Sequence, residues 1–262
     1  MAVLETETHG AILVLRMNRP ERLNALNTEL REAMAATWAM FRESRDLEVA
    51  ILTGTGRGFC AGEDMKETLG QGVPGGKKIS IEDCFRAGKL EKPVIAAVNG
   101  FAMGGGFMLV EATDLRVAVT GTQFEISEAK RWLLGGYNHG HVANMPFPIA
   151  MEMALGYRFS SERMYELGFV NRLVAPDDLM PTALGMAEHL LTLPPASRVN
   201  TVHMMRQMRP RPTPEQDALA AKLHEHGAKS DLMESRAAFA EKRKPNFKGW
   251  DDPEDRYRMP KV

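Results

Sequence analysis

The chain has 262 residues, of which 44% are hydrophobic and 26% charged, a balance that suits one large domain or one domain with a smaller helical part. Its net charge of −1 provides no basic field for a nucleic acid, so we expect no nucleic-acid partner. The two cysteines cannot build a disulfide framework, and the N-terminus lacks the basic and apolar regions of a signal peptide, which favours a cytoplasmic location. Because no window contains the ~18 apolar residues of a membrane span, no membrane partner is expected.

The first third of the chain alternates apolar runs with an amphipathic pattern. Residues 11–17 are an apolar run and predict a strand. Apolar side chains at helical spacing predict a helix over residues 28–42, and Asn27 is placed to cap its first turn. Residues 48–53 predict a second strand, and a short helix is expected at residues 81–91.

The middle of the chain repeats the order of strand, turn and helix at irregular intervals. Residues 93–98 predict a buried strand, residues 105–112 a helix, and residues 115–119 a further strand. Ser160 can cap another helix, which is expected to stop at Gly168. The irregular spacing favours stacked ββα turns over a repeat of fixed length.

The last part of the chain is mostly helical. A short strand is expected at residues 169–174, and helical patterns dominate soon after it. Asp231 and Glu234 have the spacing of a capping box before the last helix. We therefore divide the chain into an α/β core, residues 1–195, and a helical region, residues 196–262, that packs on the core or on another subunit.

Two glycine-rich turns are the strongest candidates for a functional site. Residues 58–64 follow a predicted strand, and residues 103–107 precede a predicted helix. Glycine leaves the backbone N–H groups accessible, and a helix N-terminus adds unpaired donors with a positive partial charge. One N–H from each turn can converge on a single oxygen as an oxyanion hole, in which the loss of one donor costs about 3–4 kcal/mol. The alternative is that the glycines only permit close packing of two backbones.

Several segments are similar in type, order and spacing to the crotonase superfamily, the family of enoyl-CoA hydratases and isomerases. These segments are NRPERLNALN, FCAGEDM, KPVIAAVNGFAMGGGFMLVEATDLRVA, FEISEAKRWLLGG, MALGYRFSSERMYELGFVNRLV and AFAEKRKPNFKG. The resemblance covers nearly the whole chain and implies an α/β fold, a crotonase-like spiral of ββα turns with a C-terminal helical trimerisation region. It also implies an acyl-coenzyme A (acyl-CoA) substrate, no metal, no cofactor beyond the coenzyme A of the substrate, and a homotrimer or a hexamer made of two trimers.

The resemblance assigns a role to each glycine turn. It places the thioester oxygen between the amide N–H groups of Ala61 and Gly105. The enzymatic interpretation, including the role of Glu128, depends on neither amide being already bonded to a neighbouring protein carbonyl. The segments around both turns resemble those that hold the adenine and pantetheine of coenzyme A. The implied substrate-binding residues are Arg22, Ala25, Gly62, Asp64, Met65 and Gly104. Asp64 is also expected to bond N–H groups of its own turn.

The acid–base positions depart from the family pattern. The resemblance implies two glutamates in a hydratase, at positions that are occupied here by Met108 and Glu128. Addition of water requires a base for the water and an acid for Cα, which two carboxylates with opposed roles supply. A single carboxylate, Glu128, better suits a proton shuttle that moves a double bond from the β,γ to the α,β position.

Other residues are candidates for the missing role. Glu111 lies one helical turn after Met108 and is either a substitute base or a structural glutamate. His139 and His141 are each either a base near the acyl group or a surface residue. Trp132 and Phe107 are expected to shape the acyl pocket, and Met108, Gly136 and Tyr137 are further candidate substrate-binding residues. Two alternatives stay open: a hydratase-lyase or hydrolase of an unusual acyl-CoA that uses the loop with both histidines, and a non-catalytic acyl-CoA-binding protein.

Overall fold

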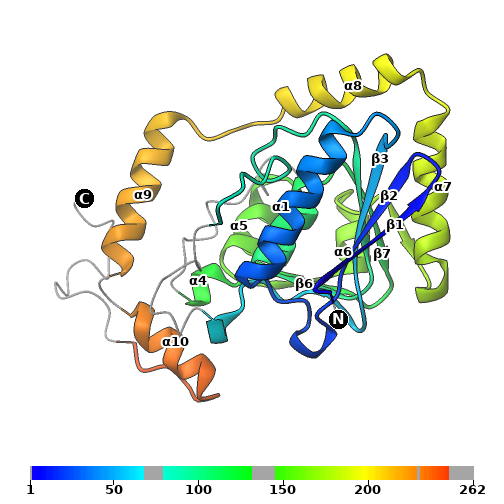
Figure 1. Cartoon of the computed structure of the whole chain (residues 1–262). Coiled ribbons are helices and arrows are strands. Elements are labelled where there is room, and N and C mark those ends of the chain that lie inside the picture. The colour runs from blue at the N-terminus through cyan, green and yellow to red at the C-terminus, as the bar shows by residue number, and fades with distance from the viewer. Residues whose placement is uncertain (1, 68–78, 132–144, 229–230, 248–262) are drawn as a thin grey trace.

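Most apolar runs of the sequence form strands of a six-stranded sheet in the computed structural model, which describes residues 2–67, 79–131, 145–228 and 231–247 (Figure 1). Its strands, in order across the sheet, are β1 (Leu4–His9), β2 (Ile12–Met17), β3 (Val49–Gly54), β5 (Val94–Val98), β7 (Leu115–Val119) and β10 (Arg172–Val174). β1 is antiparallel to β2, and all other neighbours in this sheet are parallel. Parallel strands are usually buried on both faces, which explains why these segments are continuously apolar.

A second, four-stranded sheet contains short strands. Its order is β4 (Gly58–Cys60), β6 (Phe101–Met103), β8 (Gln123–Glu125) and β9 (Arg158–Ser160). From β3 to β8, consecutive strands such as β5 and β6 enter different sheets, so each turn of this part of the chain adds one strand to each sheet. The helices α3 (Gly105–Ala112) and α4 (Glu128–Arg131) follow β6 and β8. The predicted spiral of ββα turns is thereby confirmed.

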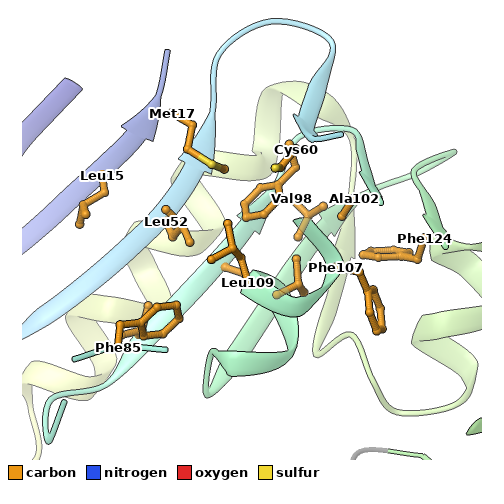
Figure 2. Packing of buried hydrophobic residues seen from close by; sticks show 14 of the residues in the cluster. Leu15, Met17, Leu52, Cys60, Phe85, Val98, Ala102, Phe107, Leu109 and Phe124 are labelled. Carbon is orange, nitrogen blue, oxygen red and sulfur yellow. The ribbon is translucent and has the colours of Figure 1, made fainter. Parts of the chain in front are cut away.

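Alternate side chains of the larger sheet enter two hydrophobic clusters. Leu15 belongs to the cluster that includes α1 (Thr28–Glu43), whereas Val14 belongs to the one that includes α7 (Leu179–Leu191). Figure 2 shows part of the first cluster, in which strand side chains lie near Leu109 of α3. Full burial of such a side chain contributes about 1.5–3 kcal/mol, so α3 is held firmly against the sheets.

Local signals placed several helix ends correctly. The remaining helices of the described residues are η1 (Pro20–Arg22), α5 (Phe147–Ala154), α6 (Ser161–Glu166), η4 (Pro176–Asp178), α8 (Pro195–Gln207), α9 (Pro214–Ala228) and α10 (Leu232–Ala240). Asn27 caps α1, since its side chain accepts a hydrogen bond from the Leu30 N–H at 3.0 Å. Ser160 caps α6 in the same way, and Gly168, with a φ of +76°, follows its end.

Three local predictions were wrong. Residues 81–91 form turns instead of a helix: the Asp83 carboxylate accepts the N–H groups of Phe85 and Arg86, both at 3.1 Å, as a helix cap would, but Gly88, with a φ of +68°, ends the turn after a few residues. Asp231 occupies the N-cap position of α10 without a side-chain capping bond, so no capping box forms there. The strand expected at residues 169–174 is limited to β10.

α8 runs across the top of the core from the α7 side, and α9 and α10 lie on the side opposite α7 (Figure 1). α8 is tied to the core by Arg206, whose guanidinium lies 2.6 Å from the Asp114 carboxylate. α10 lies beside α4, where the Ser235 hydroxyl donates to the Lys130 carbonyl at 3.1 Å. The division at residue 195 and the trimerisation role of this region stay predictions. Within the described ranges, no helix combines the length and apolar character needed to cross a membrane.

Candidate active site

The two glycine turns lie directly against each other. A Cβ atom added to Gly62, which has a φ of +89°, would lie 2.7 Å from the Met103 carbonyl oxygen and 3.3 Å from the Gly105 nitrogen. A Cβ atom added to Gly105 would in turn lie 3.9 Å from the nitrogen of Glu63. The glycines therefore do permit close backbone packing, and this packing also brings amide groups of both turns together.

The structure contradicts the assignment of Ala61 as an oxyanion donor. Its N–H donates to the Leu23 carbonyl oxygen at 3.0 Å, so it is already bonded within the protein. The neighbouring backbone pairs with Leu26, which donates to the Gly62 carbonyl at 2.7 Å and accepts from the Asp64 N–H at 3.1 Å. In a parallel bridge of this kind, the partner strand bonds the residues on either side of Glu63, and the N–H and C=O groups of Glu63 itself point away from that strand. The N–H of Glu63 is therefore directed away from Leu26, and its nitrogen lies near Gly105.

Gly105 supplies the other amide at the start of α3. The first N–H groups of a helix have no acceptor four residues earlier in that helix, and the helix dipole gives them a positive partial charge. Gly104 precedes the helix with a φ of +49°, which favours glycine, and its own N–H donates to the Glu125 carbonyl at 2.8 Å. β8 thereby fixes the position of this turn.

The carboxylate of Glu128 lies against the same turn. Glu128 is the first residue of α4 and is 8% exposed. A Cβ atom added to Gly104 would lie 3.2 Å from Glu128 Oε1 and 3.4 Å from the Ser127 hydroxyl oxygen. The Glu128 carboxylate is thus placed next to the turn where the Glu63 and Gly105 amides meet.

A cavity of about 850 Å³ unites these groups. Its volume is in the range that accommodates small molecules and cofactors. The predicted site residues that line it are Arg22, Ala25, Ala61, Gly62, Asp64, Met65, Gly104, Gly105, Met108 and Glu128. The structure therefore brings together positions from η1, the two glycine turns, α3 and α4.

Asp64 has a structural role at the rim of this cavity. Its carboxylate pairs with Arg19 at 3.0 Å and Arg22 at 2.9 Å, and it accepts the Lys66 N–H at 3.2 Å, which confirms the predicted bond within its turn. Burial alone would raise the pKa of this carboxyl, but the hydrogen bonds from Arg19 and Arg22 lower it overall. Asp64 therefore holds η1 against the first glycine turn as a charged group.

The other predicted residues do not join this group. Glu111 is buried near the end of α3 and does not line the cavity of the described residues, and it contributes to the electrostatic environment of Arg116. The structure thus favours its structural interpretation over a role as base. His139, His141, Trp132, Gly136 and Tyr137 lie outside the residues that the structure describes.

The cavity also contains side chains that the sequence did not indicate. Glu125 lines the cavity and pairs with Arg158 at 2.8 Å and Lys130 at 3.2 Å. Further residues of this kind are Arg31, Arg86, His224, Phe239 and Lys242. Their positions depend on contacts between distant segments, for which the sequence carries no local signal.

The fold and the site together define a ββα-spiral protein with paired backbone amides and a carboxylate on one cavity wall. A family model described as enoyl-CoA hydratase/isomerase matches residues 7–250, and the chain belongs to this family, within the crotonase superfamily.

Similar proteins cover most of the chain. Enoyl-CoA hydratase EchA19 of Mycobacterium tuberculosis is 33% identical over 92% of this chain and 94% of its own length. (E)-Benzylidenesuccinyl-CoA hydratase of Thauera aromatica is 36% identical over 74% of this chain and 77% of its own. The crystal structure of carnitinyl-CoA hydratase from Mycobacterium avium superimposes with a TM-score of 0.83, at 26% identity over 95% of this chain and 99% of that one.

Proposed function

We propose that this protein binds an acyl-CoA thioester and catalyses proton transfer at its Cα, with the thioester oxygen held by the N–H groups of Gly105 and Glu63. The observation that supports this most is that the Glu63 and Gly105 amides and the Glu128 carboxylate all lie against the second glycine turn and line one cavity. An enolate carries negative charge on that oxygen, and preorganised donors stabilise it more than the neutral carbonyl. Glu128 removes the Cα proton and returns it.

The presence of only one carboxylate, Glu128, at the two acid–base positions favours a double-bond shift as the overall reaction. Met108 lines the cavity where the resemblance places a second glutamate in a hydratase, and a thioether cannot act as a base for water. Glu128 can instead take a proton from Cα of a β,γ-unsaturated acyl group and deliver it to Cγ, which leaves the double bond between Cα and Cβ. Both transfers then use one carboxylate and one stabilised enolate.

Reversible hydration is a second candidate because EchA19 and the benzylidenesuccinyl-CoA enzyme are both named hydratases. This reaction requires a second acid–base group for water. Glu125 lies in the same cavity three residues before Glu128, but its carboxylate is bonded to Arg158 and Lys130. We therefore expect hydration to be slower than the double-bond shift.

Three assays separate these functions. Exchange of the Cα protons of butyryl-CoA in deuterated water tests enolate formation without any double bond, and we expect it to occur. Conversion of a β,γ-enoyl-CoA tests the shift, and crotonyl-CoA tests hydration. Release of free coenzyme A would indicate a hydrolase, and binding without exchange or turnover would indicate a non-catalytic protein.

Variants test the role of Glu128. We expect Glu128→Gln to lower the rate of Cα exchange by about 100- to 10,000-fold, because general acid–base groups contribute on that scale. Glu166→Gln removes a glutamate on the exposed side of α6 and serves as the control. A Glu128→Gln variant that exchanges as fast as the control would refute the assignment.

We also propose that the chain acts as a homotrimer or as a hexamer. Large apolar side chains are exposed on α5 and α8, among them Phe147 at 62% and Met208, just after α8, at 73%. Exposed apolar surface of this kind is typical of subunit contacts. Light scattering coupled to gel filtration measures the mass, and a monomer at micromolar concentration would contradict the proposal.

A further inference from the structure

The helix that begins with Glu128 is too short to hold its own position. α4 spans only Glu128–Arg131, and within this turn the Lys130 N–H donates to the Ser127 carbonyl at 3.1 Å. Isolated helices shorter than about 12 residues are marginal in water, because few hydrogen bonds offset the cost of forming the first turn. The position of the Glu128 carboxylate therefore depends on the contacts that α4 makes with other elements.

The side chain of Lys130 ties α4 to the smaller sheet. Its ammonium lies 3.2 Å from the carboxylate of Glu125 on β8. Glu125 is opposite Arg158 in the register of β8 and β9, and its carboxylate also pairs with that guanidinium at 2.8 Å. A Cβ atom added to Gly156 would lie 2.8 Å from Lys130 Cε, so the lysine stem lies against the turn before β9. These contacts fix the Lys130 side chain relative to β8 and β9.

The carbonyl of Lys130 ties the same helix to α10. Ser235, which is 4% exposed, donates its hydroxyl to this carbonyl at 3.1 Å across 105 residues of sequence. The last carbonyls of a helix have no N–H partner within that helix, so the hydroxyl satisfies a group that α4 leaves open. Lys130 is thus held at two points, its ammonium by β8 and its carbonyl by α10.

The face of α10 that bonds α4 also reaches the cavity. Ser235 and Phe239 are four residues apart, so their side chains lie on the same face of the helix, one turn apart. Phe239 and Lys242, which follows α10, line the cavity together with Glu128. α10 therefore contacts both the cavity and the short helix that carries the proton-transfer carboxylate.

We propose that Ser235 and Lys130 are positioning residues for Glu128, so that the docking of α10 on α4 sets the rate of proton transfer. Among the described residues, neither of the two belongs to the cavity lining, so both act through the position of α4. A displacement of about 1 Å in a reacting group can cost on the order of 100-fold in rate. The inference rests on the proposed function, since it requires Glu128 to transfer the Cα proton.

The test separates the rate of proton transfer from ligand binding. Exchange of the Cα protons of butyryl-CoA in deuterated water gives kcat and KM for each variant. We expect Ser235→Ala to lower kcat by about 10-fold and to change KM by less than about twofold, because the bond positions Glu128 and does not contact the ligand. Ser235→Thr keeps a hydroxyl and should restore most of kcat. Lys130→Met keeps the stem but removes the ammonium that pairs with Glu125, and should lower kcat in the same way.

Thr53→Val is a matched control for the loss of a buried hydroxyl. The Thr53 hydroxyl donates to the Ala97 carbonyl at 2.8 Å, between β3 and β5 of the larger sheet, and Thr53 is 1% exposed. This variant should lower the free energy of unfolding, as Ser235→Ala should, because each leaves a buried carbonyl without its donor. Only the Ser235 variant should lower kcat.

Full kcat in both Ser235→Ala and Lys130→Met would overturn the proposal, and so would an equal fall of kcat in Thr53→Val. A higher KM with an unchanged kcat would show that α10 contributes to binding alone, which would also overturn it. Absence of exchange in the unaltered protein would instead refute the proposed function.

Discussion

Replacing Gly104 with alanine tests whether the carboxylate of Glu128 must lie where the structure places it. Gly104 has a φ of +49°, and an added Cβ atom would lie 3.2 Å from Glu128 Oε1 and 3.4 Å from the Ser127 hydroxyl. A backbone in this region costs a non-glycine residue about 1–3 kcal/mol. The 3.2 Å contact is tighter than most real Cβ contacts, so Glu128 must also move by a few tenths of an ångström.

Gly121 offers a matched control for this variant. Its φ of +78° is also in the left-handed region, but nothing lies within 4 Å of the Cβ atom that alanine would add. Gly121→Ala should therefore carry the backbone strain without displacing a neighbour. We expect both variants to lower the free energy of unfolding by about 1–3 kcal/mol, measured by urea denaturation.

Only Gly104→Ala should also impair catalysis. A misplaced reacting group can cost on the order of 100-fold in rate, so we expect kcat for Cα proton exchange to fall by about 10- to 100-fold. Gly121→Ala should exchange protons at the unaltered rate. If both variants retain the full kcat, the position of Glu128 beside Gly104 is not important for proton transfer. An equal loss in both would attribute the effect to stability alone.

Three further predictions concern buried polar groups. Arg116 donates to four backbone carbonyls around the end of α3, and Arg116→Met should cost about 3 kcal/mol or more in urea denaturation; a loss below ~1 kcal/mol would contradict this. The folded-state pKa of Asp64 is lowered, so its contribution is present above the unfolded pKa of about 3.9 and is lost as the pH falls further. Asp64→Asn should thus lower the free energy of unfolding at about pH 7, and the difference from the unaltered protein should shrink below pH ~4. A difference in the free energy of unfolding that stays constant with pH would refute this role of the Asp64 carboxylate. Burial raises the pKa of the Cys60 thiol to about 12, so a disulfide reagent should modify it only when urea unfolds the protein, and rapid native-state labelling would show otherwise.

Short-range chemistry explains which elements the sequence could predict. The helix over Thr28–Glu43 follows from its apolar spacing and the Asn27 cap, both of which act within a few residues. β2 and β3 follow from apolar runs that are buried on both faces. β1 escaped prediction because its polar LETETH sequence is largely exposed at the sheet edge.

The resemblance named residues that the structure brings to one cavity, but the Ala61 amide that it implied as a donor is bonded within the protein. Gly105 and Glu128 lie where the resemblance implied, because both follow directly from the second glycine turn and its neighbouring strand. The Ala61 N–H is bonded to Leu23, and the proposed donor in the first turn is therefore Glu63, since the direction of each N–H depends on pairing with the chain at Leu23 and Leu26. That pairing joins segments more than thirty residues apart, so the sequence of the turn alone does not reveal it.

The sequence by itself determined the family, the order of ββα turns and the glycines that allow two backbones to meet, because these depend on residue type and local spacing. The tertiary structure decided which groups share the cavity, including Glu125, Arg31 and Arg86 and excluding Glu111 among the described residues. Side chains from distant strands and helices become neighbours only when the spiral closes, so no local pattern in the sequence reveals which of them share the cavity.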